Sequence, residues 1–326
     1  MMAKQGTHEM IGHQGVGDSF SGTYYVEAVY IKKTVQQKDY SDFTLRDRSG
    51  PRNVKFWGVV ADVAKGDFVF ISAGVDDYQG NPSIVAKNVE KADRPADLSD
   101  YIPAVEDLDK QAERFDEIRA ALKAIEATTG DAMPSTLVDE VYGNSAFFQK
   151  FMQSPGSDRP HYGKQGGLLS NTVRLADASM TTADFYGLKD EEKAILIASA
   201  LLCRIGAIDA YEFIDCMSTE TKRGKLIGLN NLTLGRVQSA LRRTLAAFKK
   251  AGTAVNQETM VRILHAVSSH DGACVTPMTK ESLVLNAVWN VDTEMVDALD
   301  FIETDVNVAE EFTAFDPAMK RRYYTG

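Results

Sequence analysis

The sequence contains few cysteines and no long apolar run, and each shortage excludes a class of protein. Three cysteines among 326 residues, Cys203, Cys216 and Cys274, are too few for a disulfide framework and lack the paired short spacing of a zinc site, so we expect buried thiols. The first nineteen residues hold no apolar stretch, and no later window approaches eighteen uncharged apolar residues. The sequence therefore predicts neither a signal peptide nor a membrane span, and we expect a cytoplasmic protein.

Positive charge is also in deficit, because the formal net charge is −10. An acidic balance argues against a nucleic-acid partner, but the distribution of charge along the chain matters more than its sum. Residues 20–95 carry eleven Lys or Arg against ten Asp or Glu, a net charge of +1, so this segment can bind phosphate. Between Thr219 and Lys250 eight basic residues face only Glu220, although such a run is usually a solvated helix face. These eight are Lys222, Arg223, Lys225, Arg236, Arg242, Arg243, Lys249 and Lys250.

The pattern from residue 20 to residue 92 is that of short strands. Five runs rich in β-branched and aromatic residues alternate with turn signals such as RSGP, AKGD and YQGNP. Five strands in about seventy residues suit a small barrel. We assign residues 1–19 to a flexible N-terminus and residues 93–104, which contain Pro95 and Pro103, to an acidic linker.

Helical periods of three and four residues prevail from residue 105 to residue 326. Examples are LDKQAERFDEIRAALKAIEA, EEKAILIASALLCRIG and ETMVRILHAVSS. We therefore expect an α+β multidomain protein in which an N-terminal five-stranded OB-fold β-barrel precedes an all-α domain. On the last of these helices, His265 is more typical of a packed core histidine than of a metal ligand.

The first segment resembles the OB-fold group that includes anticodon-binding domains. In that group a strand ends in an Asp-x-Ser/Thr-Gly turn, the next strand carries a Trp, and a Gly-Asp step precedes the following strand. The residues that carry the resemblance are FTLRDRSG (43–50), VKFW (54–57), KGDFV (65–69) and YQG (78–80).

Alternation along the strands assigns the two faces of this barrel. If Phe43, Leu45, Val54 and Phe56 point inward, their neighbours in the chain point outward. The outward set combines aromatic rings with Lys and Arg, which is what sequence-tolerant binding of a single strand requires, because bases stack on rings and cations follow the phosphates. The predicted nucleic-acid-binding residues are Tyr40, Arg46, Lys55, Trp57, Tyr78, Lys32 and Arg48, with Tyr78 placed on a loop. The alternative is that Trp57 packs under a loop or against the helical domain.

The second half resembles the YhaM-type exoribonucleases, a bacterial family that joins an OB-fold to an HD domain and digests single strands from the 3′ end. The segment HYGKQGGLLSNT (161–172) is similar to the family's His-His-x-x-x-Gly-Gly-Leu-x-x-His-Thr, and LLCRIG (201–206) to its Leu-His-Asp-Ile-Gly-Lys. Three further segments, GKLIGLN (224–230), SHDG (269–272) and VLNAVWNVD (284–292), are similar to family segments that contribute ligands. The resemblance spans nearly the whole chain and implies an HD-like fold for the helical domain.

The departures from the family pattern fall on its metal ligands. Only His270 and Asp292 keep the expected residue type, while the other positions hold Asn171, Cys203, Arg204, Asn230, Asp271 and Trp289. Asn is a weak neutral ligand, Trp offers no acceptor, and a guanidinium repels a cation. We therefore expect no bound metal, no cofactor and no catalytic residue, and interpret the domain as a pseudoenzyme.

Arg204 has two interpretations that the sequence leaves open. A fixed cation where metals would sit could hold a backbone phosphate, with His161, Lys164, Lys222 and Arg223 extending the track. Alternatively, Arg204 pairs with a carboxylate such as Asp271 or Asp292.

Three functions compete. The favoured one is a non-catalytic binder of single-stranded nucleic acid, DNA rather than RNA, that recruits a polymerase or another replication or transcription protein. Such a factor would suit a phage and would then act in the host cytoplasm. The second is a YhaM-like 3′-to-5′ exonuclease with a rearranged metal site built from His161, His270, Asp271 and Asp292. The third is a protein scaffold that docks partners through the helix at 107–126 and the C-terminal AMKRRYYTG segment. The oligomeric state is left open.

Overall fold

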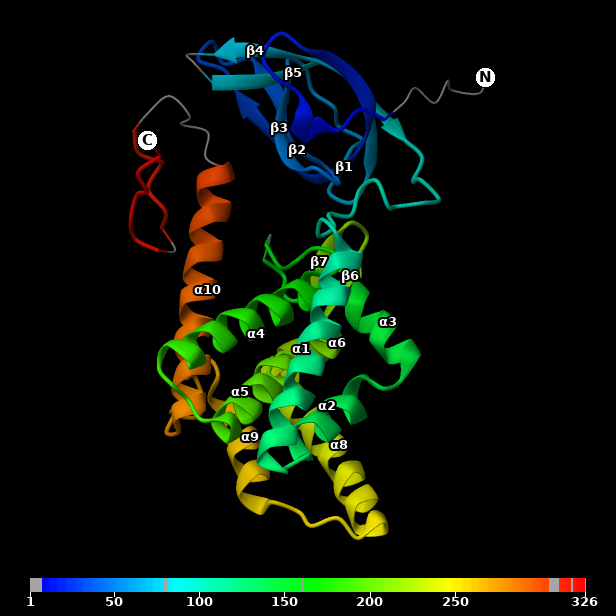
Figure 1. Cartoon of the computed structure of the whole chain (residues 1–326). Coiled ribbons are helices and arrows are strands. Elements are labelled where there is room, and N and C mark those ends of the chain that lie inside the picture. Colours follow the sequence, from blue (N-terminus) through cyan, green and yellow to red (C-terminus); the bar gives the residue numbers. More distant parts are fainter. Residues whose placement is uncertain (1–7, 79–80, 160, 305–310, 318, 326) are drawn as a thin grey trace. The chain divides into compact units, whose positions relative to one another are not determined.

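The computed structural model describes residues 8–78, 81–159, 161–304, 311–317 and 319–325. The chain divides into two compact units (Figure 1). One runs to Pro103 and includes the described residues from Phe301 onward, and the other is Ala104–Asp300. Each has its own buried apolar core.

The first unit is a closed five-stranded barrel, as the sequence predicts. Its strands are β1 (Ser19–Lys33), β2 (Asp39–Asp47), β3 (Gly50–Phe56), β4 (Phe68–Tyr78) and β5 (Asn81–Ala92). They follow the order β1-β2-β3-β5-β4, and β4 pairs with β1 to close the barrel. Neighbouring strands are antiparallel except β3 and β5, which pair in parallel at Val54–Ile84, Lys55–Val85 and Phe56–Ala86. Five strands in this arrangement make an OB-like barrel.

The period of two in β2 and β3 separates the barrel's faces as expected. Phe43, Leu45 and Val54 are buried inside, and Phe56 packs against the same core. Successive side chains of a strand point to opposite faces, so the residues between them lie on the outside. Tyr78 departs from the prediction, because it is the last residue of β4 rather than part of a loop. Residues 79–80 of the YQG turn lie outside the described residues.

Part of the segment that the sequence assigns to a flexible N-terminus packs on the barrel. The single-turn helix η1 (Ile11–His13) buries Ile11, whose N–H donates to the Asp47 carboxylate at 2.6 Å. The Gly12 N–H donates to Ser49 Oγ at 2.7 Å. Asp47 and Ser49 belong to the Asp-x-Ser-Gly turn, which thus fastens the chain that precedes β1.

The linker assigned to 93–104 also packs on the barrel, near its C-terminal end. Tyr101 is buried with its ring 5.0 Å from that of Phe68, and the Arg48 N–H donates to the Asp100 carbonyl at 2.7 Å. This part of the first unit ends at Pro103.

The second unit is built mainly from helices. They are α1 (Leu108–Thr129), α2 (Met133–Tyr142), α3 (Ser145–Gln153), α4 (Gly167–Phe185), α5 (Asp190–Leu202), α6 (Ala207–Ala210), α7 (Lys222–Ile227), α8 (Leu229–Ala251), α9 (Gln257–Ser269) and α10 (Lys280–Thr304). The division between the units falls within α10, after Asp300. Helix α5 is its centre, since every residue from Ala194 to Leu202 is buried and α1, α4 and α9 pack on it.

The expectation of an all-α second part is wrong at two places. Strands β6 (Tyr211–Ile214) and β7 (Met217–Glu220) form an antiparallel hairpin between α6 and α7. Its turn begins at Asp215, which adopts the left-handed conformation (φ 56°) that Asp tolerates better than most residues. The described residues after 310 form no helix either, but isolated bridges, Phe312–Tyr324 and Asp316–Arg321. Of the predicted docking segment AMKRRYYTG, residues 318 and 326 lie outside the described part.

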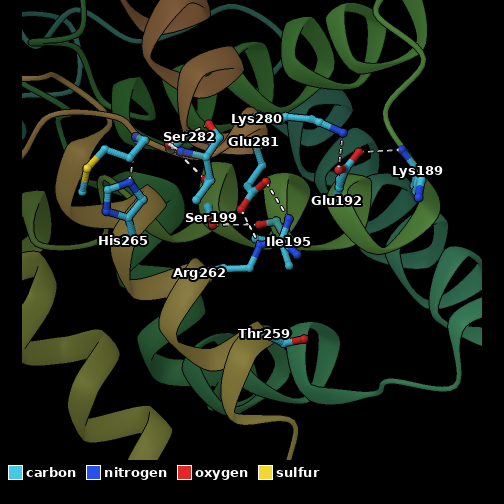
Figure 2. Close-up of polar contacts among 12 residues, drawn as sticks. Lys189, Glu192, Ile195, Ser199, Thr259, Arg262, His265, Lys280, Glu281 and Ser282 are labelled. Carbon is cyan, nitrogen blue, oxygen red and sulfur yellow. Dashed lines mark hydrogen bonds and ion pairs between the residues drawn. The ribbon is translucent and has the colours of Figure 1, made fainter.

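A polar cluster joins α5, α9 and the start of α10 (Figure 2). Glu281 is fully buried and accepts two hydrogen bonds from Arg262, at 2.8 Å each. His265 is half-buried and its Nε2 accepts the Met278 N–H at 3.0 Å. His265 thus has a structural hydrogen bond, but it is half-buried and not the packed core histidine that the sequence predicts. None of the described helices is long and apolar enough to cross a membrane.

Candidate nucleic-acid interface

Cross-strand pairing gathers most of the predicted binding residues on the outer face of β1, β2 and β3. Lys32 lies opposite Tyr40, whose ring is 5.2 Å from that of Trp57. One step along, Asp42 lies opposite both Tyr30 and Lys55. Directly opposite residues share a face of the sheet, so these side chains form two neighbouring rows. We call Tyr30, Lys32, Tyr40, Lys55, Trp57 and Tyr78 the barrel face.

The aromatic members of the barrel face are open to solvent. Trp57 and Tyr78 are both 61% exposed and Tyr30 is 60% exposed, whereas Tyr40 is half-buried. The Lys55 ammonium lies over the Tyr78 ring, 5.5 Å from its centre. Within the barrel unit, this exposure does not match the alternative in which Trp57 packs under a loop; packing of Trp57 against the helical domain stays a prediction. Tyr30 is missing from the sequence prediction, although its alternation with Ile31 and Val29 in β1 would have placed it on this face.

Several of the predicted cations are neutralised by neighbouring carboxylates. Lys32 donates to Asp42, which raises the pKa of Lys32. Arg46 is half-buried and its Nε donates to Glu27 at 2.8 Å. A register shift in β1 between Val26 and Ala28 accompanies this pair and does not show in the sequence pattern. Among the described residues, Lys55 has no carboxylate partner, so it is the cation of the barrel face best able to meet a phosphate. Arg48 has none either, but it lies in the turn after β2, at the other end of that strand from Tyr40.

In the helical unit, Asp292 is the centre of a buried network rather than an open ligand. Its Oδ2 accepts from Tyr162 Oη at 2.5 Å and from Asn171 Nδ2 at 3.4 Å. Its Oδ1 accepts from Arg174 at 2.9 and 3.1 Å. Burial, followed by the nearby Asp292 charge, raises the pKa of Tyr162 well above its ordinary value. Tyr162 therefore stays a neutral donor to this carboxylate.

Arg204 is buried against Trp289, with the centre of its guanidinium 4.8 Å from the ring. The residue is 8% exposed, and its Nη2 donates to the Gly156 carbonyl at 2.8 Å. Burial lowers its pKa. Within the described chain no carboxylate lies at ion-pair distance from it, so neither of the two pairings that the sequence suggests is formed. Its phosphate role stays a prediction, and the enclosed guanidinium is not part of an open track.

The other positions at which the predicted resemblance would place metal ligands are also hydrogen-bonded or buried. Asn230 Nδ2 donates to Asp271 Oδ2 at 2.7 Å. His270 is fully buried with Nδ1 at 2.9 Å from the Val267 carbonyl, and burial lowers its pKa to about 4, so the ring is neutral at pH 7. Burial raises the pKa of the Cys203 thiol to about 12. Across the ranges that the structure describes, no three His, Cys, Asp or Glu side chains form a group that could hold a metal ion.

The remaining predicted phosphate contacts fall at two places. His161 and Lys164 lie in the turn before α4, where the His161 ring stands edge-on to Tyr162 at 4.6 Å. Lys222 and Arg223 are exposed on α7 and line a hollow beside the β6–β7 hairpin. The single track expected from the sequence is therefore not supported by shared contacts.

Comparison with known proteins gives little further identification. No family model matches the chain, and no curated protein matches it. Among solved structures, the chain is similar to the second OB-fold domain of replication protein A from Methanococcus maripaludis, a solution NMR structure. The identity is 20%, the match covers 28% of this chain and 99% of that domain, and the TM-score is 0.23. The OB-like assignment therefore depends on the barrel's own closure and strand order, and the resemblance to YhaM-type enzymes stays a prediction.

Proposed function

We propose that the protein binds single-stranded nucleic acid through the barrel face and does not cleave it. The observation that carries the proposal is the exposed Trp57 ring beside Tyr40, with Lys55 over the Tyr78 ring in the next row. Rings that water reaches can stack on unpaired bases, and an unneutralised lysine between them can meet the backbone phosphate. In OB-folds the face of strands 2 and 3 is the one that binds oligonucleotides.

The proposed lack of catalysis is supported by the hydrogen bonds that the carboxylates of the helical unit already accept. The Asp292 carboxylate is already bonded to Tyr162 and Arg174, and Asp271 to Asn230. A carboxylate bound in this way is poorly disposed to take a divalent cation. Arg204, a fixed cation, lies in the same region.

The test measures binding of labelled single-stranded DNA, single-stranded RNA and duplex DNA to the full chain, and the strand length after incubation with manganese. We expect single strands to be preferred, DNA to bind more tightly than RNA, and strand length to stay constant. Trp57→Ala should weaken single-strand binding about fivefold or more, since a base stacked on an aromatic ring contributes about 1–3 kcal/mol.

The matched control is Phe185→Ala, which removes a ring that is 81% exposed on α4 of the other unit. It should leave the affinity unchanged. Equal affinity after Trp57→Ala and Lys55→Ala are combined would refute the barrel face as the binding site. Strands shortened by the protein with manganese would contradict the non-catalytic part and favour an exonuclease.

A further inference from the structure

The helical unit carries a second surface in which aromatic and basic side chains meet. A hollow of about 540 Å³ lies beside the β6–β7 hairpin, and its lining includes Lys150, Tyr211, Phe213, Lys222 and Arg223. We call it the hairpin hollow. A larger hollow of about 850 Å³, bounded in part by Phe147, Arg236 and Arg243, shares Asp209 and Arg223 with it, so the two adjoin.

Local structure fixes the walls of the hairpin hollow. Tyr211 and Phe213 alternate along β6, and therefore lie on one face of the hairpin, both half-buried. Ser218 on β7 donates to the Ser157 carbonyl at 2.6 Å, which fastens the hairpin to the chain before α4. A hairpin fastened in this way can present aromatic rings on which a nucleotide base stacks.

Helix α7 is held equally firmly and presents Lys222 and Arg223. The Thr221 hydroxyl caps it, accepting the Gly224 N–H at 2.9 Å and donating to the Asp209 carbonyl at 2.7 Å. A Cβ at Gly224 would lie 2.6 Å from the Ala210 carbonyl oxygen, so only glycine lets α7 approach α6 this closely.

The cations of the two hollows differ in how far they are neutralised. In the larger hollow, Arg236 binds Asp209 with two hydrogen bonds, at 2.5 and 2.9 Å, and Arg243 donates to Glu140. Burial alone would raise the pKa of Asp209, but the bonds from Arg236 outweigh it and lower that pKa. Asp209 is therefore a charged partner committed to Arg236.

The hairpin hollow keeps its positive charge available. Arg223 shares Asp209 with Arg236, donating to its Oδ1 at 3.4 Å, whereas within the described residues Lys150 and Lys222 have no carboxylate partner. All three are exposed, and of the lining carboxylates only Glu212 remains uncommitted. In a chain of net charge −10, this local excess favours an anionic ligand.

We infer that the hairpin hollow binds one nucleotide of a single strand. The base would lie against Tyr211 and Phe213, and Lys150, Lys222 and Arg223 would hold the flanking phosphates. The volume falls within the range of about 300–1,000 Å³ that small-molecule sites occupy. The identity of the ligand rests on the proposed function, but the site shares no residue with the barrel face.

The experiment cross-links a single-stranded oligodeoxynucleotide containing 5-bromodeoxyuridine to the full chain and maps the modified peptides. Cross-links at Tyr211 or Phe213 are expected beside those at Tyr40 or Trp57. Combining Lys222→Ala with Arg223→Ala should abolish the hairpin cross-links. It should also reduce the slope of log affinity against log salt by about 0.7 for each phosphate that the variant no longer binds.

Lys249→Ala combined with Lys250→Ala is the matched control, because it removes the same charge from exposed residues of α8 that line neither hollow. Hairpin cross-links should survive it. They should also survive Trp57→Ala combined with Lys55→Ala, which removes the barrel cross-links. In the unmodified chain, hairpin cross-links without any barrel cross-link would refute the proposed barrel site alone. Absence of hairpin cross-links in the unmodified chain would overturn this inference. Complete loss of these cross-links when poly-glutamate of equal charge is added as a competitor would also overturn it, and would indicate that the hollow binds an acidic peptide.

Discussion

Among single residues of the helical unit, Glu281 is a fully buried carboxylate. Burial alone would raise its pKa, yet the two bonds from Arg262 outweigh that effect and lower it. A buried carboxylate is tolerated only while such a partner is present. The pair joins α9 to the start of α10 (Figure 2).

Arg262→Met should therefore destabilise the helical unit by about 3 kcal/mol, because it leaves a buried charge without a partner. Combining it with Glu281→Leu should recover most of the loss, since the unpaired charge then disappears. Urea unfolding followed by circular dichroism measures both variants. Similar stability of the single and double variants would show that the loss comes from packing rather than charge.

The residues that sequence reasoning placed correctly are those governed by a strict local period. Phe43, Leu45 and Val54 lie inside because alternate side chains of a strand share one face, and in β2 and β3 the apolar ones share the face that is buried. Arg46 was expected to offer its charge to a ligand, but Glu27 neutralises it through a register shift that no local pattern encodes. Likewise, the partners of Arg204 depend on where Gly156 and Trp289 meet in space.

At the scale of elements, the Asp-x-Ser-Gly turn between β2 and β3 holds η1 in place. Burial alone would raise the pKa of Asp47, but the His8 ring, with its Nε2 3.3 Å away, and hydrogen bonds from Ser49 and the Ile11 N–H outweigh it, so the pKa is lowered. A depressed folded-state pKa means that this stabilisation is complete above the ordinary aspartate pKa of about 4 and is lost as the pH falls below it.

Asp47→Asn should lower the stability of the barrel at pH 7 by about 2 kcal/mol, the scale of a hydrogen bond to a charged group. The difference between variant and parent should shrink as the pH falls below about 4. Thermal melts from pH 7 to pH 3 measure it, and a difference that is constant with pH would exclude the carboxylate charge as the cause.

Two glycines of the helical unit should respond oppositely to alanine. A Cβ at Gly206 would overlap the backbone nitrogen of Thr233, where α6 packs on α8. A Cβ at Gly235, inside α8, would meet nothing. Gly206→Ala should therefore destabilise the unit, whereas Gly235→Ala should stabilise it by about 0.5–1 kcal/mol through helix propensity. Chemical denaturation of the two variants side by side tests the sign of each effect.

Long elements were predictable and short ones were not. The strands of the barrel and helices such as α1 repeat their period often enough to be recognised in the sequence. The β6–β7 hairpin has four residues in each strand, and its sequence YEFIDCMSTE contains no Gly, Pro or Asn as a turn signal. The sequence pattern therefore did not predict the hairpin, nor the aromatic wall that it gives the hairpin hollow.

At the scale of the whole molecule, each unit has a separate core and one of the two tryptophans, Trp57 or Trp289. We expect two unfolding events that each tryptophan reports separately. In a Trp289→Phe background, Val54→Ala should lower the midpoint of the unfolding transition that Trp57 reports. In a Trp57→Phe background, Leu201→Ala should lower the midpoint of the transition that Trp289 reports. The Leu201→Ala loss should be about 2–5 kcal/mol. A single transition, shifted equally in both backgrounds, would contradict independent cores.

Charge is also organised at this scale, because a chain of net charge −10 places cations beside aromatic rings both on the barrel face and at the hairpin hollow. This organisation could be predicted only in part. Residue counts locate the basic segments, but they do not tell which of the cations are neutralised by carboxylates. A replication or transcription partner and an HD-like ancestry for the helical unit stay predictions from sequence resemblance.

The parallel pairing of β3 with β5 has a consequence for the barrel's internal motions. It is shorter than the antiparallel pairings and of a kind slightly less stable per residue, so amide hydrogens there should exchange with solvent sooner than those between β4 and β5. Lys55 lies on this seam and belongs to the barrel face. Bound nucleic acid that holds β3 in place would therefore slow amide hydrogen exchange in β5. Binding at the outer face would then be detectable in β5, although β5 contributes no side chain to the proposed contact.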